Sequence, residues 1–160
     1  MDLKNRSNIE LIKLYGALLD EMRSRKIIRS KNVTGDLGES IVIDHYNKTK
    51  GLPKLYRAPP DLKDIDATSV KADRYTIKCT TTDKTDAFRG IPKDFSAHEI
   101  KPLFEYLVIV KLDRSYEKEL ILQVEWETFL KHIRWNSRLQ AHTLSLSRAL
   151  IEDSTVIYLK

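Results

Sequence analysis

Apolar and polar positions near the start of the chain alternate with a helical period. Between residues 8 and 27 the apolar side chains recur every three or four positions, which predicts an amphipathic helix. The apolar stripe consists of Leu11, Leu14, Tyr15, Leu18 and Met22, widened by Ile12 and Leu19. Ser7 or Asn8 can cap the first turn. Such a stripe fits packing in a core or a dimer face, and neither requires any chemistry.

A second helix is predicted from Thr34, its expected N-cap, to about Asn47. Its apolar stripe consists of Leu37, Ile41, Val42 and Tyr46. Gly35 and Gly38 lower the helix propensity of the first turns, so we expect the helix backbone to pack closely against a neighbour there. Glu39 lies in the first or second turn.

Beyond residue 53 the pattern changes to short strands. The predicted strands cover residues 54–58, 64–70, 74–80, 104–112, 119–124 and 155–159, and short helices cover 126–133 and 145–152. The strand at 104–112 is apolar along most of its length, as expected for a strand buried on both faces. Residues 81–102 show no period and predict a long loop. The whole pattern predicts an α/β fold, with a central mixed β-sheet flanked by helices, in a single domain over residues 1–160.

The charge and the apolar runs narrow the range of functions. The chain has 28 Lys and Arg against 23 Asp and Glu, a net charge of +5. This excess suits a polyanionic partner, although basic surfaces also occur in proteins that bind no nucleic acid. No apolar run approaches the ~18 residues that cross a membrane, and the polar N-terminus has no apolar signal core. We therefore expect a cytoplasmic protein with no membrane partner.

Cysteine and histidine give no sign of a metal site. The lone Cys79 cannot form an internal disulfide, and it lies on the apolar side of its predicted strand, as a buried structural thiol would. The histidines have no Cys or Glu at metal-ligand spacing, so we expect them on the surface or on helix faces. They are His45, His98, His132 and His142, of which His98 lies in the loop after residue 80.

Polar side chains share one face of each of the two strands predicted at 64–70 and 74–80. Successive side chains of a strand point to opposite faces of the sheet. One face of the first strand carries Asp64, Asp66 and Thr68, and one face of the second carries Thr76, Lys78 and Thr80. The other faces are largely apolar, as expected where one side of a sheet meets the core and the other lines a site.

The short separation of these strands predicts a hairpin. If Asp66 faces Lys78, the same register places Val70 opposite Arg74 and leaves residues 71–73 as a three-residue loop. A two-residue loop would break the shared polar face unless a bulge restored it. We therefore predict a loop with an odd number of residues, or a bulge.

The polar face is suited to the hydrolysis of phosphodiester bonds. That reaction needs a hydroxide nucleophile and relief of the charge on the phosphate, and Mg²⁺ held by hard oxygen ligands supplies both. A nearby lysine can orient the water and stabilise developing negative charge. Asp66 and Lys78 on neighbouring strands provide such a pair, and Glu39 is placed to reach in from the preceding helix.

In this order the residues resemble the PD-(D/E)xK restriction-endonuclease-like nucleases. A Glu on a helix, an Asp at a strand start and an acid-x-Lys on the next strand correspond to Glu39, Asp66 and Thr76-Ile77-Lys78. The resemblance implies a restriction-endonuclease-like fold and Mg²⁺-dependent cleavage of DNA, with Mn²⁺ as a substitute metal. Glu39 and Asp66 would then bind the metal, Lys78 would position the attacking water, and Thr76 would line the site.

Thr76 departs from the family's pattern, because it replaces the middle acid. A threonine hydroxyl is a poor Mg²⁺ ligand beside a carboxylate. Either Glu39 supplies the missing charge from the helix, or Asp64 supplies it from the strand, or the site is inactive. We favour Glu39. The inactive alternative predicts a DNA-binding or scaffold subunit that keeps a nuclease-like fold.

Basic residues in two segments are candidates for contacting DNA. The loop after the second strand could clamp a DNA backbone, or it could be an ordinary solvated loop. The segment after residue 131 could contact phosphates through its arginines, or it could be a polar helix face over a tryptophan core. The candidates are Lys84, Arg89, Lys93, Arg134 and Arg138.

The sequence thus predicts a Mg²⁺-dependent DNA endonuclease, such as a type II restriction enzyme or its small cleavage subunit. A domain of this size can hardly surround double-stranded DNA alone. We expect either a homodimer that cuts both strands symmetrically or a heterodimer with a larger recognition subunit. A protein-interaction module with a basic surface is the remaining alternative.

Overall fold

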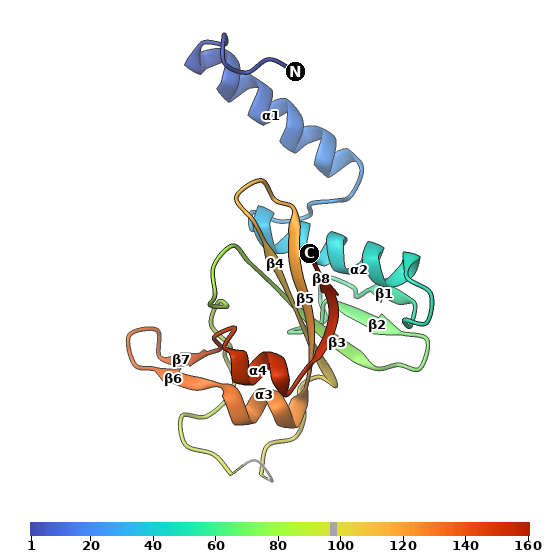
Figure 1. Ribbon diagram of the computed structural model, residues 1–160, viewed down its shortest axis with the longest axis vertical. Helices are drawn as coiled ribbons and strands as arrows, with labels where there is room; N and C mark the ends of the chain where they lie inside the picture. The colour runs from blue at the N-terminus through green and yellow to red at the C-terminus, as the bar shows by residue number, and fades with distance from the viewer. Residues whose placement is uncertain (97–98) are drawn as a thin grey trace.

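The protein forms a mixed sheet with helices on both faces in a computed structural model, which describes residues 1–96 and 99–160 (Figure 1). Within these residues the sheet has six strands in the order β1-β2-β3-β4-β5-β8, and β6 and β7 form a separate hairpin. The strands are β1 (Leu55–Arg57), β2 (Ala67–Ser69), β3 (Arg74–Thr80), β4 (Tyr106–Leu112), β5 (Lys118–Glu125), β6 (Arg134–Asn136), β7 (Ala141–Thr143) and β8 (Thr155–Leu159). The helices are α1 (Asn8–Ser24), α2 (Val33–Lys48), α3 (Trp126–His132) and α4 (Arg148–Glu152).

The strand directions make the sheet mixed, as predicted. β1, β2 and β3 pair antiparallel, β3 and β4 pair parallel, and β4, β5 and β8 pair antiparallel. A parallel pair needs a long crossover connection, because the chain must return to the end of the sheet from which it started. The connection from β3 to β4 is this crossover, which explains the long segment without a period in the sequence.

Apolar cores lie on both faces of the sheet. On one face α2 packs Val42 and Tyr46 against side chains of β4 and β5 that include Val108. On the other face Phe129 of α3 and Leu150 of α4 belong to a cluster that includes β4 side chains such as Ile109. Because β4 contributes to both cores, its middle residues are buried on both sides, as its apolar sequence predicted. The predicted α/β architecture is confirmed.

Helix α2 lies very close to β3. A Cβ atom added to Gly38 would lie 2.3 Å from Cβ of Cys79, so no larger residue fits without movement. The expected close packing is therefore confirmed at this glycine. The N-cap is Asn32 and not Thr34, because the Asn32 side chain accepts the N–H of Gly35 at 3.1 Å. Gly35 leaves room for this cap, since its Cβ would clash with the Asn32 amide.

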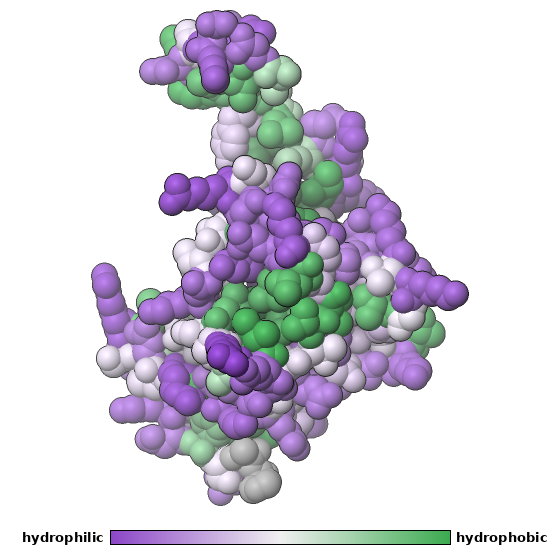
Figure 2. Space-filling model, viewed as in Figure 1, coloured by the Kyte–Doolittle hydropathy of each residue, from purple (hydrophilic) through white to green (hydrophobic). Residues whose placement is uncertain are grey.

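Helix α1 projects away from the rest of the molecule (Figure 1). It begins with a capping box between Ser7 and Glu10, which confirms Ser7 as its cap. No residue of α1 is buried in the described part of the chain, and its apolar stripe is open to solvent at Tyr15 (58% exposed) and Leu18 (51%) (Figure 2). None of the helices in the described ranges combines the length and the apolar character of a membrane crossing.

The segment that could have been a polar helix face forms the β6–β7 hairpin instead. Trp135 of β6 lies opposite His142 of β7, and their rings meet edge to face with centroids 5.1 Å apart. His142 is buried, where we expected a surface position, and its Nε2 lies 2.8 Å from the carbonyl oxygen of Pro92. The N–H of Phe88 also donates to the carbonyl of His142, so the crossover after β3 is tied to this hairpin.

Candidate functional site

A polar cavity of about 290 Å³ lies beside β3, on the face of the sheet that α3 and α4 cover. Its polar lining consists of Asp64, Asp66, Thr76, Lys78 and Arg89. The aromatic rings of Phe88 and Phe104 form part of its wall. The cavity therefore brings together Asp66 and Lys78, which were predicted to share a site, with Arg89 of the crossover loop.

The register between β2 and β3 differs from the predicted one. Ala67 pairs with Tyr75, and the ladder ends there, so Asp66 does not face Lys78 across it. The N–H of Asp66 donates to the carbonyl of Tyr75, and the carboxylate Oδ2 of Asp66 accepts the N–H of Ile77 at 2.6 Å. Asp66 thus reaches β3 one residue before Lys78.

The turn of this hairpin explains the difference. The Ser69 N–H bonds to the carbonyl of Asp73 at 3.0 Å, and the Ser69 hydroxyl bonds to the Asp73 carboxylate at 2.9 Å. Residues 70–72 therefore form the tip, one residue earlier than the predicted 71–73. Ala72 takes a left-handed conformation, with φ of +64°, to complete the turn. Side-chain bonding by Ser and Asp moved the turn, which strand periodicity alone does not reveal.

Asp66 directly precedes the first residue of β2, and its carboxylate reaches the backbone of β3. Backbone N–H groups of a strand point along the sheet toward the neighbouring strand, and the Asp66 carboxylate takes the Ile77 N–H in place of a β2 carbonyl. Oδ1 of Asp66 has no hydrogen-bond partner among the described residues. This position between the two faces lets groups from both sides of the sheet approach the same carboxylate.

Lys78 approaches from the face that carries the cavity. Its register partner in the parallel ladder is Ile109, a residue of the core on that face. The Lys78 ammonium lies 5.2 Å from the centre of the Phe88 ring. Among the residues that the structure describes it makes no hydrogen bond or ion pair, although its charge lowers the pKa of Asp66. Lys78 is therefore free to bind an anion in the cavity.

Thr76 lines the cavity but its hydroxyl is already engaged. The side chain is 5% exposed, and its hydroxyl donates to the backbone carbonyl of Asp64. Asp64 itself has a left-handed backbone, with φ of +61°, and is exposed at the cavity mouth. Thr76 thus fixes the segment before β2 and leaves Asp64 and Asp66 as the carboxylates of the cavity.

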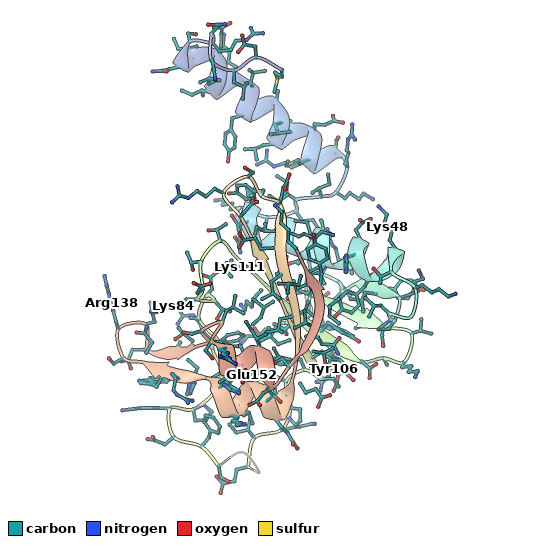
Figure 3. All side chains as sticks on the ribbon, viewed as in Figure 1. Lys48, Lys84, Tyr106, Lys111, Arg138 and Glu152 are labelled. Carbon is teal, nitrogen blue, oxygen red and sulfur yellow. The ribbon has the colours of Figure 1, made fainter. Side chains whose placement is uncertain are left out.

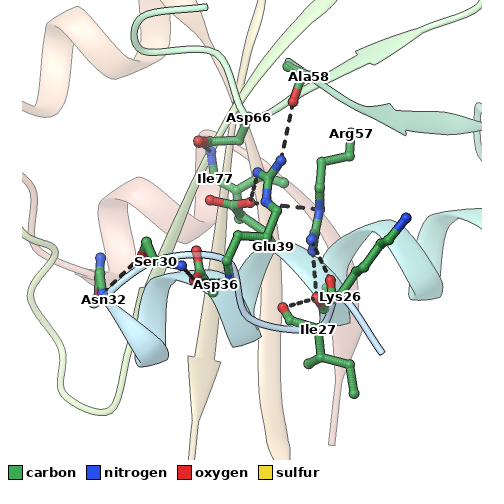
Figure 4. A network of polar contacts seen from close by, with 12 residues as sticks. Lys26, Ile27, Ser30, Asn32, Asp36, Glu39, Arg57, Ala58, Asp66 and Ile77 are labelled. Atoms are coloured by element: carbon green, nitrogen blue, oxygen red, sulfur yellow. Dashed lines mark hydrogen bonds and ion pairs between the residues drawn. The ribbon is translucent and has the colours of Figure 1, made fainter. Parts of the chain in front are cut away.

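Glu39 approaches Asp66 from the opposite face, on α2. Its carboxylate Oε2 accepts a hydrogen bond from Nη2 of Arg29 at 3.0 Å and lies 3.9 Å from Nε of Arg57 (Figure 4). The Glu39 side chain is only 13% exposed, and it is not part of the cavity lining. The structure brings Glu39 next to Asp66, but behind the cavity and in contact with two arginines.

Both carboxyl groups have a raised pKa. Burial raises the pKa of Glu39, and the neighbouring charge of Asp66 raises it further, while Arg29 and Arg57 lower it. Burial also raises the pKa of Asp66, and Asp64 adds to this, while the Ile77 N–H, Lys78 and Arg29 lower it. Carboxylates that repel each other in a partly buried place are stabilised by a cation between them.

The donors present fit a cation that keeps most of its water. In residues 1–96 and 99–160 no three or more His, Cys, Asp and Glu side chains are grouped to hold a metal ion. Mg²⁺ usually retains several waters and needs one or two protein carboxylates. Asp66 has an Oδ1 that is free to bind the cation. The second carboxylate ligand would come from Glu39, or from Asp64, which also lines the cavity. This donor set suits Mg²⁺ or Mn²⁺ and not zinc.

The candidate DNA contacts lie in two places. Arg89 lines the cavity, and Lys93 is exposed further along the same crossover. Lys84 and Arg138 are exposed on the side of the molecule that carries β6 and β7 (Figure 3). The guanidinium of Arg134 caps the carbonyls at the end of α3, at 2.8 and 3.0 Å. His98 lies outside the described residues.

Sequence reasoning missed three residues that hold the site together. Arg29 and Arg57 contact Glu39, and Asp36 accepts the backbone N–H groups of Arg29 and Ser30 at 2.6 Å each. Asp36 is 5% exposed, an unusual place for a carboxylate. In the sequence Arg29 is part of a general basic cluster, and no local pattern singles out any of the three.

The chain matches no model of a known protein family, and no curated protein matches its sequence.

Proposed function

We propose that this protein is a Mg²⁺-dependent DNA endonuclease with a restriction-endonuclease-like fold. The observation that carries the proposal is the unpaired ammonium of Lys78 in the same cavity as the Asp66 carboxylate, with Arg89 at its wall. An ammonium, a guanidinium and a partly buried carboxylate around one cavity are the groups that phosphodiester hydrolysis uses. The order Glu39 on a helix, Asp66 at a strand start and Lys78 on the next strand supports it.

Each side chain has a role in this proposal. Mg²⁺, when bound, would lower the pKa of a bound water, which favours a hydroxide nucleophile, and would withdraw charge from the phosphate. Asp66 and Glu39 would hold it, with Asp64 as the alternative second carboxylate. Lys78 would orient the attacking water and stabilise negative charge on the phosphate oxygens. Thr76 would fix the position of the segment that carries Asp64 and Asp66, because its hydroxyl is bonded there.

Nicking of supercoiled plasmid by the purified chain tests the proposal. We expect cleavage with Mg²⁺ or Mn²⁺ and none with a chelator. Lys78→Ala should lower the rate by about 10²- to 10³-fold, which is typical for loss of a group that stabilises the transition state. Lys48→Ala is the matched control, because Lys48 is an exposed lysine at the far end of α2 (Figure 3). Equal rates for the two variants would contradict the proposal.

A DNA-binding or scaffold subunit without catalysis is the second candidate. The feature that favours it is Thr76, since its engaged hydroxyl leaves the middle acid of the family's pattern without a substitute on β3. This candidate predicts salt-sensitive DNA binding by a mobility shift, with no Mg²⁺-dependent nicking. Binding that survives Lys78→Ala without any cleavage in the wild type would establish it over the nuclease.

Cutting both strands of DNA would require a second chain. We propose a homodimer or a heterodimer with a larger recognition subunit. The exposed apolar stripe on α1 supports a protein partner, because a 17-residue helix gains little stability in water without packing. Sedimentation of the purified chain separates the two options, since a chain that stays monomeric alone needs another subunit.

A further inference from the structure

We propose that Arg29 is a positioning residue, which holds Glu39 while no divalent cation is bound and is released to a DNA phosphate when the cation binds. This inference rests on the nuclease function proposed above and adds a step to it. It assigns a role in substrate binding to a residue outside the cavity lining. It also predicts that the cation and DNA favour each other's binding through one guanidinium.

The backbone of Arg29 is anchored independently of its side chain. The buried carboxylate of Asp36 accepts the N–H groups of Arg29 and Ser30, which fixes the turn before α2. The guanidinium contributes nothing to that anchor. Its own contacts are the Glu39 carboxylate at 3.0 Å and the carbonyl of Ala58 at 3.5 Å, the second at the limit of a hydrogen bond. The side chain can therefore exchange partners without loosening the turn.

Arg57, the other arginine at Glu39, is held differently. Its guanidinium donates to the carbonyl of Lys26 and to the hydroxyl of Ser40, and Ser40 in turn donates to the carbonyl of Ile27. These contacts join β1, α2 and the segment before α2, and they do not depend on Glu39 (Figure 4). Its side chain is 21% exposed, against 32% for Arg29. Arg29 has weaker hydrogen bonds to the backbone and is more exposed than Arg57, so Arg29 is the arginine that can move.

Electrostatics gives the exchange its direction. A divalent cation at Glu39 and Asp66 would take over the neutralisation of Glu39 and repel the guanidinium beside it. Arg29 is hydrogen-bonded to Glu39, and Glu39 lies beside Asp66 (Figure 4), so the guanidinium is near the carboxylate that the phosphate must approach. A guanidinium binds phosphate oxygens through paired hydrogen bonds, which an ammonium cannot reproduce. The released Arg29 and the free Lys78 would then bracket one phosphate.

The first part of the proposal, that Arg29 competes with the cation for Glu39, is tested by binding Mn²⁺ to the chain alone. Loss of the free-ion signal in electron paramagnetic resonance measures this binding. Arg29→Met removes the competing charge, so we expect Mn²⁺ to bind on the order of tenfold more tightly than in the wild type. Arg29→Lys should stay near the wild type, because it keeps the charge. Arg148→Met is the control for the charge change, since Arg148 forms an exposed ion pair with Glu152. Arg29→Gln repeats the test should Arg29→Met not fold.

The second part, that the released Arg29 binds a DNA phosphate, is tested by binding a short fluorescent duplex with and without Ca²⁺. Ca²⁺ is a cation that takes the same class of ligands. Ca²⁺ should strengthen duplex binding in the wild type, and this gain should fall about tenfold in Arg29→Met, because linked equilibria are reciprocal. Arg29→Lys should recover part of the gain.

The outcomes separate this inference from the nuclease proposal. Equal Mn²⁺ affinity in the wild type and Arg29→Met, with binding abolished by Asp66→Asn, would overturn the role of Arg29 and leave the metal site standing. Mn²⁺ binding in Arg29→Met but not in the wild type would support the inference strongly. No Mn²⁺ binding in either chain would overturn both proposals.

Discussion

At the scale of single residues, the position of Asp66 explains most of the site. The ladder between β2 and β3 starts at Ala67, directly after Asp66, so the Asp66 carboxylate is free to accept the N–H of Ile77 on β3. Lys78 lines the same cavity as Asp66, and Glu39 of α2 lies beside Asp66 outside that lining (Figure 4). A carboxylate at a strand end thus connects two groups that the sheet would otherwise separate.

The pH dependence of cleavage should follow these carboxyl groups. Burial raises the pKa of Asp66 and of Glu39 above their ordinary values of 3.8 and 4.5. A protonated carboxyl group binds Mg²⁺ poorly, so at limiting Mg²⁺ the rate should fall as the pH drops toward these raised values. A pH–rate profile of plasmid nicking measures this. An acidic limb at or below the ordinary values would contradict the assignment of both groups.

Replacing Asp66 should increase stability while it removes activity. Because the folded-state pKa of Asp66 lies above the unfolded value, its ionised form costs folding free energy, and that cost disappears as the pH falls through the raised pKa. An asparagine keeps an oxygen for the Ile77 N–H without the charge. Asp66→Asn should therefore unfold at a higher urea concentration than the wild type at pH 8, with a smaller advantage in acid.

Asp113→Asn provides the opposite control for this measurement. Backbone N–H groups of Glu117 and Ser115 and the ammonium of Lys160 lower the pKa of Asp113. Its ionised form therefore favours folding at neutral pH, and this contribution is lost as the pH falls. Asp113→Asn should lower stability at pH 8. If Asp66→Asn also lowered it, the carboxylate would be a net structural contributor and our account of its burial would be wrong.

At the scale of elements, the contact between α2 and β3 sets where Glu39 can reach. Gly38 lies against Cys79, so the helix backbone comes directly onto the strand that carries Lys78. Burial raises the pKa of the Cys79 thiol to about 11, as for an inert packing residue. The close approach of α2 therefore places Glu39 near the sheet, and the position of Glu39 depends on the neighbouring Gly38.

Gly38→Ala should move the helix away from the strand. Its Cβ would meet the Cys79 side chain at 2.3 Å, so we expect a loss of about 1–3 kcal/mol in the free energy of unfolding and slower nicking. Gly16→Ala on α1 is the matched control, because nothing lies within 4 Å of its Cβ. That change should stabilise α1 by up to about 1 kcal/mol and leave nicking unchanged. Equal effects of the two substitutions on urea unfolding would show that α2 can accommodate a Cβ at Gly38 beside Cys79.

At the scale of the whole molecule, the chain has a net charge of +5, and two basic residues, Lys78 and Arg89, line the cavity. Arg89 is at its wall, and Lys84 and Arg138 extend the basic surface toward β6 and β7 (Figure 3). A duplex lying across the cavity would meet this surface. Affinity for DNA would then depend on salt, because bound phosphates release counterions.

Arg89→Ala should weaken DNA binding uniformly across sequences. Loss of one phosphate contact lowers the slope of log affinity against log salt by about 1. Arg148→Ala should leave the slope unchanged, since its guanidinium is 92% exposed and paired with Glu152 on α4. Fluorescence anisotropy with a labelled duplex at several salt concentrations measures both. A slope that Arg89→Ala does not alter would remove the cavity from the DNA-binding surface.

The sequence by itself determined the parts of this protein that depend on local periodicity. The apolar run of β4, the alternation along β3 and the stripe of α2 each specify which side of the element faces the core, and all three elements formed where expected. The sequence also placed Asp66 and Lys78 at one site, and both line the cavity, although Asp66 precedes β2 and the predicted pairing of the two residues was wrong. These features depend on neighbours within a few residues, so they can be read without the fold.

Only the tertiary structure decided which partner each polar group has. The hydrogen bond of Ser69 with Asp73 sets the β2–β3 turn one residue earlier than predicted. The segment after α3 forms the β6–β7 hairpin, which is hydrogen-bonded to the crossover loop. Glu39 took Arg29 and Arg57 as partners, 10 and 18 positions away in the chain. Ion pairs and hydrogen bonds between distant side chains depend on how the elements pack, because a charge binds whichever opposite charge the fold places beside it.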